Sequence, residues 1–266
     1  MKAYDPNPPL RFIVYVGPQR FVLLAESLVL DRSHAPYRRP AATLLLAYKA
    51  PMLLEVGEGA ALSTQAALVA PKVARKRLAA EGLVAIDFPV HSGEYAAVQP
   101  VLGGEDVVAL DFARFEPLVP CLTRAFAGNL SGAEVHALTR DLVVAIAGKP
   151  PDDRALDPRV EKAMQLINDL PREEATPASL ARRLHLSTSR LGHLFKEQTG
   201  STLSYFMRWV ALWRGVALWT QGRSLTEVAH EVGYYDLAHL DHAFTDFFGV
   251  NPSTAIDPRH VRLIRF

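Results

Sequence analysis

The segment 187–198 combines basic and hydroxyl side chains with apolar ones and is patterned as one helix with two faces. Ser187 is a suitable N-cap, and Leu191, Leu194 and Phe195 recur at helical spacing that predicts a buried face. The other face carries Thr188, Ser189, Arg190, His193 and Lys196. Arginine and histidine can donate hydrogen bonds to base edges and lysine to phosphates, so these residue types predict contact with DNA.

Position along this helix separates the expected roles. Arg190 and His193 lie in its N-terminal half and are expected at base edges, whereas Lys196 lies further along and is expected at a phosphate. The whole chain has a net charge of +1, but residues 172–223 sum to +5 and residues 224–266 to −3. Phosphate neutralisation supplies much of protein–DNA affinity, so the first of these segments has the charge of a DNA-binding unit. A solvated face that binds nothing also carries Arg and Lys, and this alternative stays open.

Residues that could support catalysis or a metal ion are few. Cys121 is the only cysteine, it lies in an apolar helical pattern, and the neighbouring Arg124 is a poor base partner for a nucleophile. His34 and His91 are isolated and lack the clustered His-x-His and carboxylate of a barrel-type metal centre. We therefore expect no enzyme activity, no metal and no cofactor.

The second half of the chain is predicted to be wholly helical. Asp157-Pro158 and Thr176-Pro177 each supply a cap followed by a proline at the first helical position. Ser224 to Glu227 reads as a capping box, and Asp236 caps a further helix. A helix-turn-helix pattern therefore occurs twice, at about 177–198 and 225–247, with a long helix over 203–220 between them. The DNA-facing candidates of the second unit are Leu237, Ala238, Asp241 and His242.

The first half has a different pattern. Short β-rich runs at 12–16, 21–30, 43–46 and 83–88 are separated by glycine and proline turns, which predicts an antiparallel barrel or sandwich. Two amphipathic helices follow at 116–126 and 131–147, the second opened by a capping box at Ser131 and Glu134. Gly148 to Asp153 breaks the pattern and is the predicted linker. The longest apolar runs are far below the ~20 residues of a membrane span, and we expect a cytoplasmic protein.

The helical half resembles the AraC/XylS family of transcriptional regulators in "SLARRLHLSTSRLGHLFKEQTG" (179–200) and "SLTEVAHEVGYYDLAHLDHAFTDFFGVNP" (224–252). The resemblance covers about 100 residues. It implies two helix-turn-helix units that present recognition helices to the major groove on one face of the DNA. The matching positions are Ser187, Leu191, Leu194, Phe195, Lys196, Gly200, Val228, Ala229, Gly233, His239, Phe244, Gly249 and Pro252. Asp241, Asp246 and Ala211 depart from the family pattern, and the second unit is therefore expected to make weaker contacts.

The resemblance also implies an α+β protein with two domains. Residues 1–150 would form a cupin-like antiparallel half-barrel with a helical pair, used for effector binding and dimerisation, and residues 155–266 the DNA-binding domain. Helix 131–147, alone or with 116–126, is expected to form a homodimer contact or to pack against the barrel. Three polar residues near strands are candidates for effector binding: His34, Tyr37 and Glu55.

The expected function is sequence-specific transcriptional regulation controlled by a small-molecule effector. The expected partners are double-stranded promoter DNA, that effector, a second copy of the chain and, for an activator, RNA polymerase. Two alternatives are a regulator that responds to no ligand and a cupin-like enzyme with a DNA-binding tail.

Overall fold

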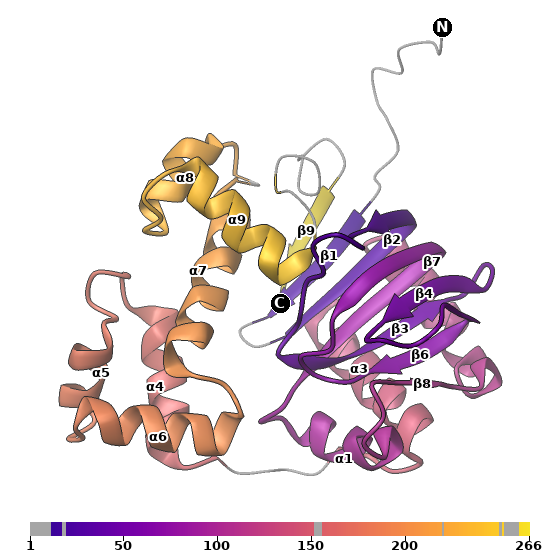
Figure 1. Cartoon of the computed structure of the whole chain (residues 1–266), viewed down its shortest axis with the longest axis horizontal. Helices are drawn as coiled ribbons and strands as arrows, with labels where there is room; N and C mark the ends of the chain where they lie inside the picture. Colours follow the sequence, from indigo (N-terminus) through magenta and orange to yellow (C-terminus); the bar gives the residue numbers. More distant parts are fainter. Residues whose placement is uncertain (1–11, 18–19, 152–155, 220, 250–251, 253–260) are drawn as a thin grey trace, which may run out of the picture.

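The computed structural model describes residues 12–17, 20–151, 156–219, 221–249, 252 and 261–266 and has an N-terminal sheet and a C-terminal helical part (Figure 1). The strands are β1 (Phe12–Gly17), β2 (Arg20–Asp31), β3 (Ala41–Ala47), β4 (Met52–Val56), β5 (Leu62–Thr64), β6 (Ala66–Val69), β7 (Arg75–Pro89), β8 (Val107–Ala109) and β9 (Val261–Arg265). The helices are α1 (Gly93–Leu102), α2 (Val119–Phe126), α3 (Gly132–Ala147), α4 (Pro158–Asp169), α5 (Pro177–Arg183), α6 (Thr188–Thr199), α7 (Leu203–Trp219), α8 (Leu225–Glu231) and α9 (Leu237–Phe248). Two 3-10 turns, η1 (Phe112–Arg114) and η2 (Glu116–Leu118), precede α2. Several residues of predicted segments lie outside the described residues: Asp152 and Asp153 of the linker, Thr220 of the helix 203–220, and Val250 and Asn251 of the family-like segment.

The described strands form one nine-stranded sheet in the order β8-β6-β3-β7-β2-β1-β9, with β4 paired to β7 and β5 to β4. The long strand β7 pairs with β2 along one edge and with β3 and β4 along the other, all antiparallel. The antiparallel pairing expected for the first half is therefore present. One strand pair is parallel instead: β9, from the end of the chain, lies beside β1 with Ile13 opposite Arg262.

Strand β1 has no polar alternation because both of its faces are buried. Ile13 and Tyr15 pack into a core that the sheet shares with α1, α2 and α3. The intervening Val14 packs into a second core, formed with α7, α8, α9 and Val261 of β9. The sheet and the C-terminal helices therefore share a hydrophobic core, and the last strand of the chain belongs to the N-terminal sheet rather than to the helical part.

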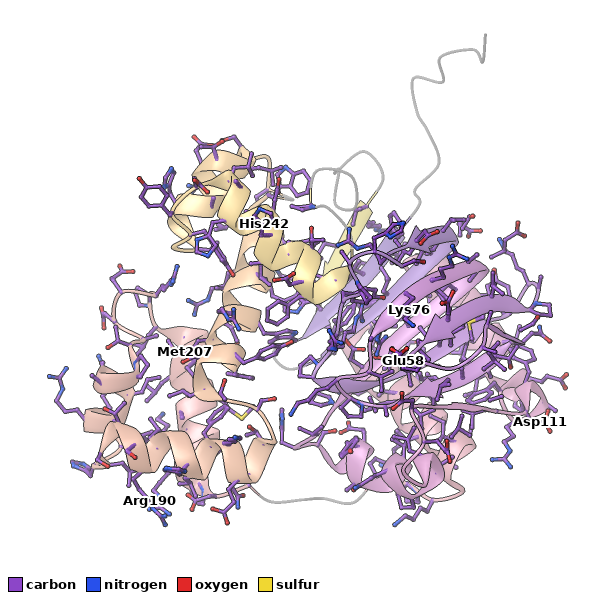
Figure 2. All side chains as sticks on the ribbon, viewed as in Figure 1. Glu58, Lys76, Asp111, Arg190, Met207 and His242 are labelled. Atoms are coloured by element: carbon purple, nitrogen blue, oxygen red, sulfur yellow. The ribbon has the colours of Figure 1, made fainter. Side chains whose placement is uncertain are left out.

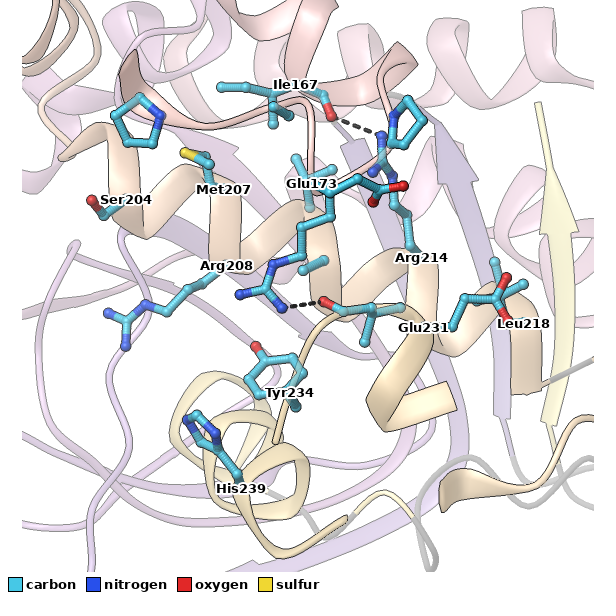
Figure 3. A pocket seen from close by; sticks show the side chains of 18 of the residues that line it. Ile167, Glu173, Ser204, Met207, Arg208, Arg214, Leu218, Glu231, Tyr234 and His239 are labelled. Carbon is cyan, nitrogen blue, oxygen red and sulfur yellow. Dashed lines mark hydrogen bonds between the residues drawn. The ribbon is translucent and has the colours of Figure 1, made fainter. Parts of the chain in front are cut away.

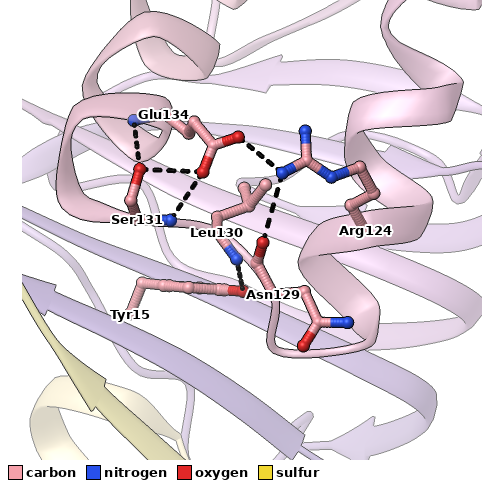
Figure 4. A network of polar contacts seen from close by, with 6 residues as sticks. All are labelled: Tyr15, Arg124, Asn129, Leu130, Ser131 and Glu134. Carbon is pink, nitrogen blue, oxygen red and sulfur yellow. Dashed lines mark hydrogen bonds and ion pairs between the residues drawn. The ribbon is translucent and has the colours of Figure 1, made fainter.

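A buried hydroxyl and a capping box hold the loop between α2 and α3 in place (Figure 4). The hydroxyl of Tyr15 donates to the Ala125 carbonyl at 3.0 Å and accepts from the Leu130 amide at 3.3 Å. The predicted box is present, since Ser131 and Glu134 each accept from the other's backbone amide. Arg124 also binds the Glu134 carboxylate and so links the two helices.

The predicted helix starts in the second half are confirmed. The side chains of Asp157, Thr176, Ser187 and Asp236 each accept a backbone hydrogen bond at the N-terminus of their helix. The second capping box, Ser224 with Glu227, is also formed. Two short helix pairs, α5–α6 and α8–α9, thus flank α7. Within the part of the chain that the structure describes, none of the helices could cross a membrane.

Candidate nucleic-acid interface

Helix α6 presents one polar face to solvent. Leu191, Leu194 and Phe195 are buried in a core with α4, α5 and α7, which fixes the rotation of the helix about its axis. The Ser187 hydroxyl accepts from the Arg190 amide at 3.1 Å and fixes its N-terminus. The residues of α6 that are predicted to contact DNA are all exposed on the remaining face: Thr188, Ser189, Arg190, His193 and Lys196. The sequence thus places five polar side chains together on one accessible surface.

The carboxylate of Asp157 lies close to this face. Hydrogen bonds from the Arg159 side chain and amide, with a smaller contribution from the charge of Arg190, lower the pKa of Asp157 to about 2. Arg159 binds both of its oxygens, at 2.9 and 2.6 Å. Asp157 is therefore paired with Arg159, and Arg190 remains able to use its donors outward.

Four of the eight basic side chains counted in residues 172–223 have a hydrogen-bond or ion-pair partner among the described residues. Arg183 pairs with Glu174 at 3.2 Å, and Arg223 pairs with Glu231 at 2.6 Å. Arg172 and Arg214 bind backbone carbonyls and hold helices together. The other four are Arg182, Arg190, Lys196 and Arg208. Three of these four lie on α5 and α6, so the positive charge open to a phosphate is concentrated on the first helix pair.

A groove of about 900 Å³ runs along α7 between the two helix pairs (Figure 3). Arg172 spans it, donating to the Val232 carbonyl at 2.7 Å with its guanidinium over the ring of Tyr234. Arg214 donates to the Ile167 carbonyl at 2.8 Å and ties α7 to the end of α4. These contacts keep the two helix pairs in a defined relative position.

Helix α9 has a different surface. Its buried residues include three phenylalanines from its second half, Phe244, Phe247 and Phe248, in the core shared with the sheet. Of the residues predicted to face DNA, Ala238 and His242 are exposed, whereas Leu237 and Asp241 are partly buried. Asp246 is exposed on the same helix. The face available to DNA is therefore smaller and more acidic than that of α6. His239 places its ring edge-on to Tyr234 at 5.0 Å, which is a packing role.

The C-terminal ends of α6 and α9 both lie against the sheet domain. Each helix ends in a left-handed glycine, Gly200 at φ 67° and Gly249 at φ 76°. A Cβ at Gly200 would lie 2.6 Å from Val90, and one at Gly249 would lie 2.5 Å from the ring of Tyr37. Arg190, near the N-terminal end of α6, lies away from the sheet (Figure 2).

The proposed effector residues do not come together. Tyr37 is buried and lines a cavity between the sheet and helices α7 and α9. His34 is exposed, and Glu55 lies 3.8 Å from Arg77 in an ion pair; neither lines this cavity. Two residues that the sequence did not indicate, Arg39 and Arg75, line it instead.

Among the described residues no group of three His, Cys, Asp or Glu side chains could hold a metal ion. Cys121 is partly buried in the core between the sheet and its helices. Burial raises the pKa of its thiol, which keeps it protonated. This is the environment of a structural cysteine.

Residues 180–257 match the family model of a helix-turn-helix domain. The fold of most of the chain is similar to that of apo ToxT from Vibrio cholerae, with 11% identity, a TM-score of 0.51, and coverage of 88% of this chain and 96% of that one. The C-terminal domain of AraT, a response regulator from Geobacillus stearothermophilus, is 25% identical over 37% of this chain and 83% of that chain, with a TM-score of 0.34. A regulator from Chromobacterium violaceum with an AraC-type DNA-binding domain is 21% identical over 38% of this chain and 92% of that one, with a TM-score of 0.36. Among curated proteins, none matches this sequence.

Proposed function

We propose that this chain, a DNA-binding transcriptional regulator of the AraC/XylS family, reads promoter DNA chiefly through α6 and responds to a small molecule bound by its first domain. The observation that carries the proposal is the exposed face of α6, on which Arg190, His193 and Lys196 lie beside one another. Arg190 and His193 would donate to base edges in the major groove, and Lys196 would bind a phosphate.

The second helix pair contributes less to affinity in this proposal. It would enter the next major groove with Leu237, Ala238, Asp241 and His242, in a second helix-turn-helix unit. Its surface lacks the free cations of the first pair, and acidic groups that face the phosphates oppose binding. The 17 residues of α7 span about 25 Å at 1.5 Å per residue. Successive major grooves on one face of DNA are about 34 Å apart, a distance that α7 and the width of the two units together can cover.

The partners of such a regulator are double-stranded promoter DNA in the cytoplasm, a small-molecule effector and, for an activator, RNA polymerase. In this proposal residues 1–150 bind the effector and form the dimer, and residues 155–266 bind DNA. The shared core between sheet and helices gives a direct route by which a ligand in the first part could alter the second.

A homodimer through α3, alone or with α2, is also part of the proposal. The apolar stripe of α3 is buried against the sheet through residues such as Leu138 and Leu142. The contact would therefore use the outer face of the helix, where Val144 is exposed. Sedimentation of the full chain at tens of micromolar tests this point, and a monomer there removes the dimer from the proposal.

Selection of bound fragments from a random DNA library tests the proposed function. We expect enrichment of a site with two motifs about one helical turn apart, of which the one contacted by α6 carries more sequence information. Retention of DNA without any enriched motif would reduce the protein to a non-specific DNA binder and contradict the proposal.

A further inference from the structure

One carboxylate on the second candidate recognition helix has no partner in the described part of the protein. Asp241 lies on α9 and is partly buried. Its Oδ1 atom is enclosed and has no hydrogen-bond partner among the described residues. Helix α9 contains no lysine or arginine that could pair with it. An enclosed acceptor without a partner destabilises the folded state, so its presence in the protein needs an explanation.

The position of Asp241 on α9 brings it to the border of the exposed face. Leu240 and Phe244 pack into the core shared with the sheet, which fixes the rotation of the helix about its axis. Ala238, one turn before Asp241, and His242, the residue after it, are both exposed. The carboxylate is therefore held by its enclosed side and remains partly accessible to a molecule that approaches the exposed face.

The equivalent position on α6 is open to solvent. Asp241 is the fifth residue of α9, and the fifth residue of α6 is Gly192. A Cβ added to Gly192 would have no atom within 4 Å, so no other part of the described protein covers this position. When both helices enter a major groove, Gly192 allows the duplex to approach closely, whereas Asp241 places a carboxylate against the base edges.

We propose that Asp241 selects a cytosine in the DNA motif bound by α9. An ionised carboxylate can only accept hydrogen bonds. In the major groove the donors are the N4 amino group of cytosine and the N6 amino group of adenine, whereas guanine and thymine present acceptors. The inference rests on the proposed function and names one base that the second helix pair reads.

The atoms beside the amino group favour cytosine over adenine. Adenine presents the acceptor N7 next to its N6 amino group, so a carboxylate placed there also faces a lone pair. Cytosine presents the donor alone. A charge-assisted hydrogen bond from cytosine N4 satisfies the carboxylate of Asp241, while each of the other three bases sets an acceptor against it.

This contact gives selectivity rather than affinity. Binding removes the carboxylate from water and brings it near phosphates, which opposes association, and the hydrogen bond from cytosine offsets that cost. A wrong base leaves the carboxylate unpaired beside an acceptor, so the loss of affinity falls on mismatched sites. An acidic α9 is therefore compatible with a sequence preference in the second motif.

Selection from a random DNA library tests the proposal with three full-length proteins: the parent chain, Asp241→Ala and Asp241→Asn. We expect the parent protein to enrich a cytosine at one position of the second motif. Asp241→Ala should lose the preference at that position. Asp241→Asn should replace the cytosine by adenine, because an asparagine amide pairs with both N6 and N7 of adenine.

Binding titrations measure the size of the preference. They use four versions of the selected site that differ only at that base pair. The parent protein should bind the cytosine site roughly tenfold more tightly than each of the other three. Asp241→Ala should bind all four sites within about twofold of one another, because the group that distinguishes them is absent.

Asp246→Asn is the matched control. It removes the same charge from the same helix, at an exposed position. This variant should keep the cytosine preference and change only the overall affinity and its salt dependence. Loss of the cytosine preference in Asp246→Asn would mean that the preference follows the net charge of α9, and that result overturns the proposal.

A structural role for Asp241 gives a different result. Because its Oδ1 atom has no partner, Asp241→Asn should unfold at the same or a higher temperature than the parent protein. A clearly lower unfolding temperature together with an unchanged base preference would make Asp241 a residue of the fold alone and overturns the proposal.

The same selection separates the two levels of inference. A second motif without a preferred cytosine, or one that keeps its cytosine in Asp241→Ala, removes the role of Asp241 and leaves the proposed function in place. Absence of any enriched motif with the parent protein removes the proposed function itself.

Discussion

The ring of Tyr37 packs directly against Gly249, the left-handed residue that ends α9. Tyr37 belongs to the sheet domain and also lines the cavity between the sheet and helices α7 and α9, while Gly249 terminates the second candidate recognition helix. The end of α6 has an equivalent contact between Gly200 and Val90. Both candidate recognition helices are therefore supported at their C-terminal ends by the sheet domain.

Replacing Gly249 with alanine tests the contact with Tyr37. Alanine in the left-handed region costs about 1–2 kcal/mol, and overpacking against a neighbouring ring adds about 1–3 kcal/mol. The control is Gly148→Ala, at φ 71° with no atom within 4 Å of the added Cβ, which carries only the first cost. Urea unfolding should therefore show a clearly larger loss for Gly249→Ala. Equal losses in the two variants would show that Tyr37 moves aside freely.

Acid should weaken the connection between α2 and α3 through Glu134. Hydrogen bonds from Ser131 and then from Arg124 lower the pKa of Glu134 from 4.5 to about 2. Because the pKa of Glu134 is lower in the folded state, its carboxylate stabilises that state fully above about pH 4.5. This stabilisation is lost as the pH falls toward 2.

Glu134→Gln should therefore be less stable than the parent protein at pH 7, with a difference in urea midpoint that narrows between pH 4.5 and 2. Glu105→Gln, at an exposed position, controls for the removal of one negative charge. A difference that stays constant over this range would mean that the Glu134 carboxylate does not stabilise the folded state.

Strand β9 should depend on Phe266 for its attachment to the sheet. The Phe266 amide donates to the Val16 carbonyl at 3.1 Å, and its ring lies edge-on to His136 at 5.2 Å. Because this ring is only partly buried, Phe266→Ala should cost about 1–2 kcal/mol, less than the ~3–5 kcal/mol of a fully buried phenylalanine.

Hydrogen exchange should show faster exchange of the β1 and β9 amides in Phe266→Ala and no change in Arg265→Ala, whose side chain is exposed. Unchanged protection of both strands in Phe266→Ala would mean that the pairing with β1 holds β9 without the aromatic contact.

The acidic surface of α9 should limit the affinity for DNA. Asp246 is exposed, and its replacement by lysine turns an unfavourable charge near phosphates into a favourable one. We expect Asp246→Lys to bind a selected DNA site more tightly, with a salt slope steeper by about one unit. Glu105→Lys, on the sheet domain, makes the same change in net charge and should alter neither quantity. If the two variants have the same DNA affinity and the same salt slope, Asp246 lies away from the DNA.

Helix boundaries could be predicted from the sequence because their signals are local. Ser131 with Glu134 and Ser224 with Glu227 identify helix starts within four residues, and the structure has both boxes. The short strands β4, β5, β6 and β8 have no such signal and were not predicted. Strand β9 was missed for a further reason, since its partner β1 lies at the opposite end of the chain and no local pattern indicates that pairing.

The sequence does not indicate the two arginines that line the cavity between the sheet and helices α7 and α9, because arginine is almost always found on the surface. Arg75 opens a strand with Lys76 and Arg77, a run that is typical of a solvated strand end. Polar residues near strands are candidates for a pocket rim, and on this ground the sequence indicates His34, Tyr37 and Glu55, of which only Tyr37 lines the cavity. Burial of a charge depends on tertiary packing, here of α7 and α9 over the sheet, which the sequence alone does not reveal.

The most direct measurement is a binding titration of Arg190→Ala, Lys196→Ala and His242→Ala against one selected DNA site at several salt concentrations. Arg190→Ala should cost about 1–3 kcal/mol if its guanidinium reads a guanine edge. Lys196→Ala should weaken all sequences alike and lower the salt slope by about one unit, and His242→Ala should have a smaller effect than either. If His242→Ala abolishes binding and Arg190→Ala leaves it unchanged, α9 is the principal reader and the role assigned to α6 is wrong.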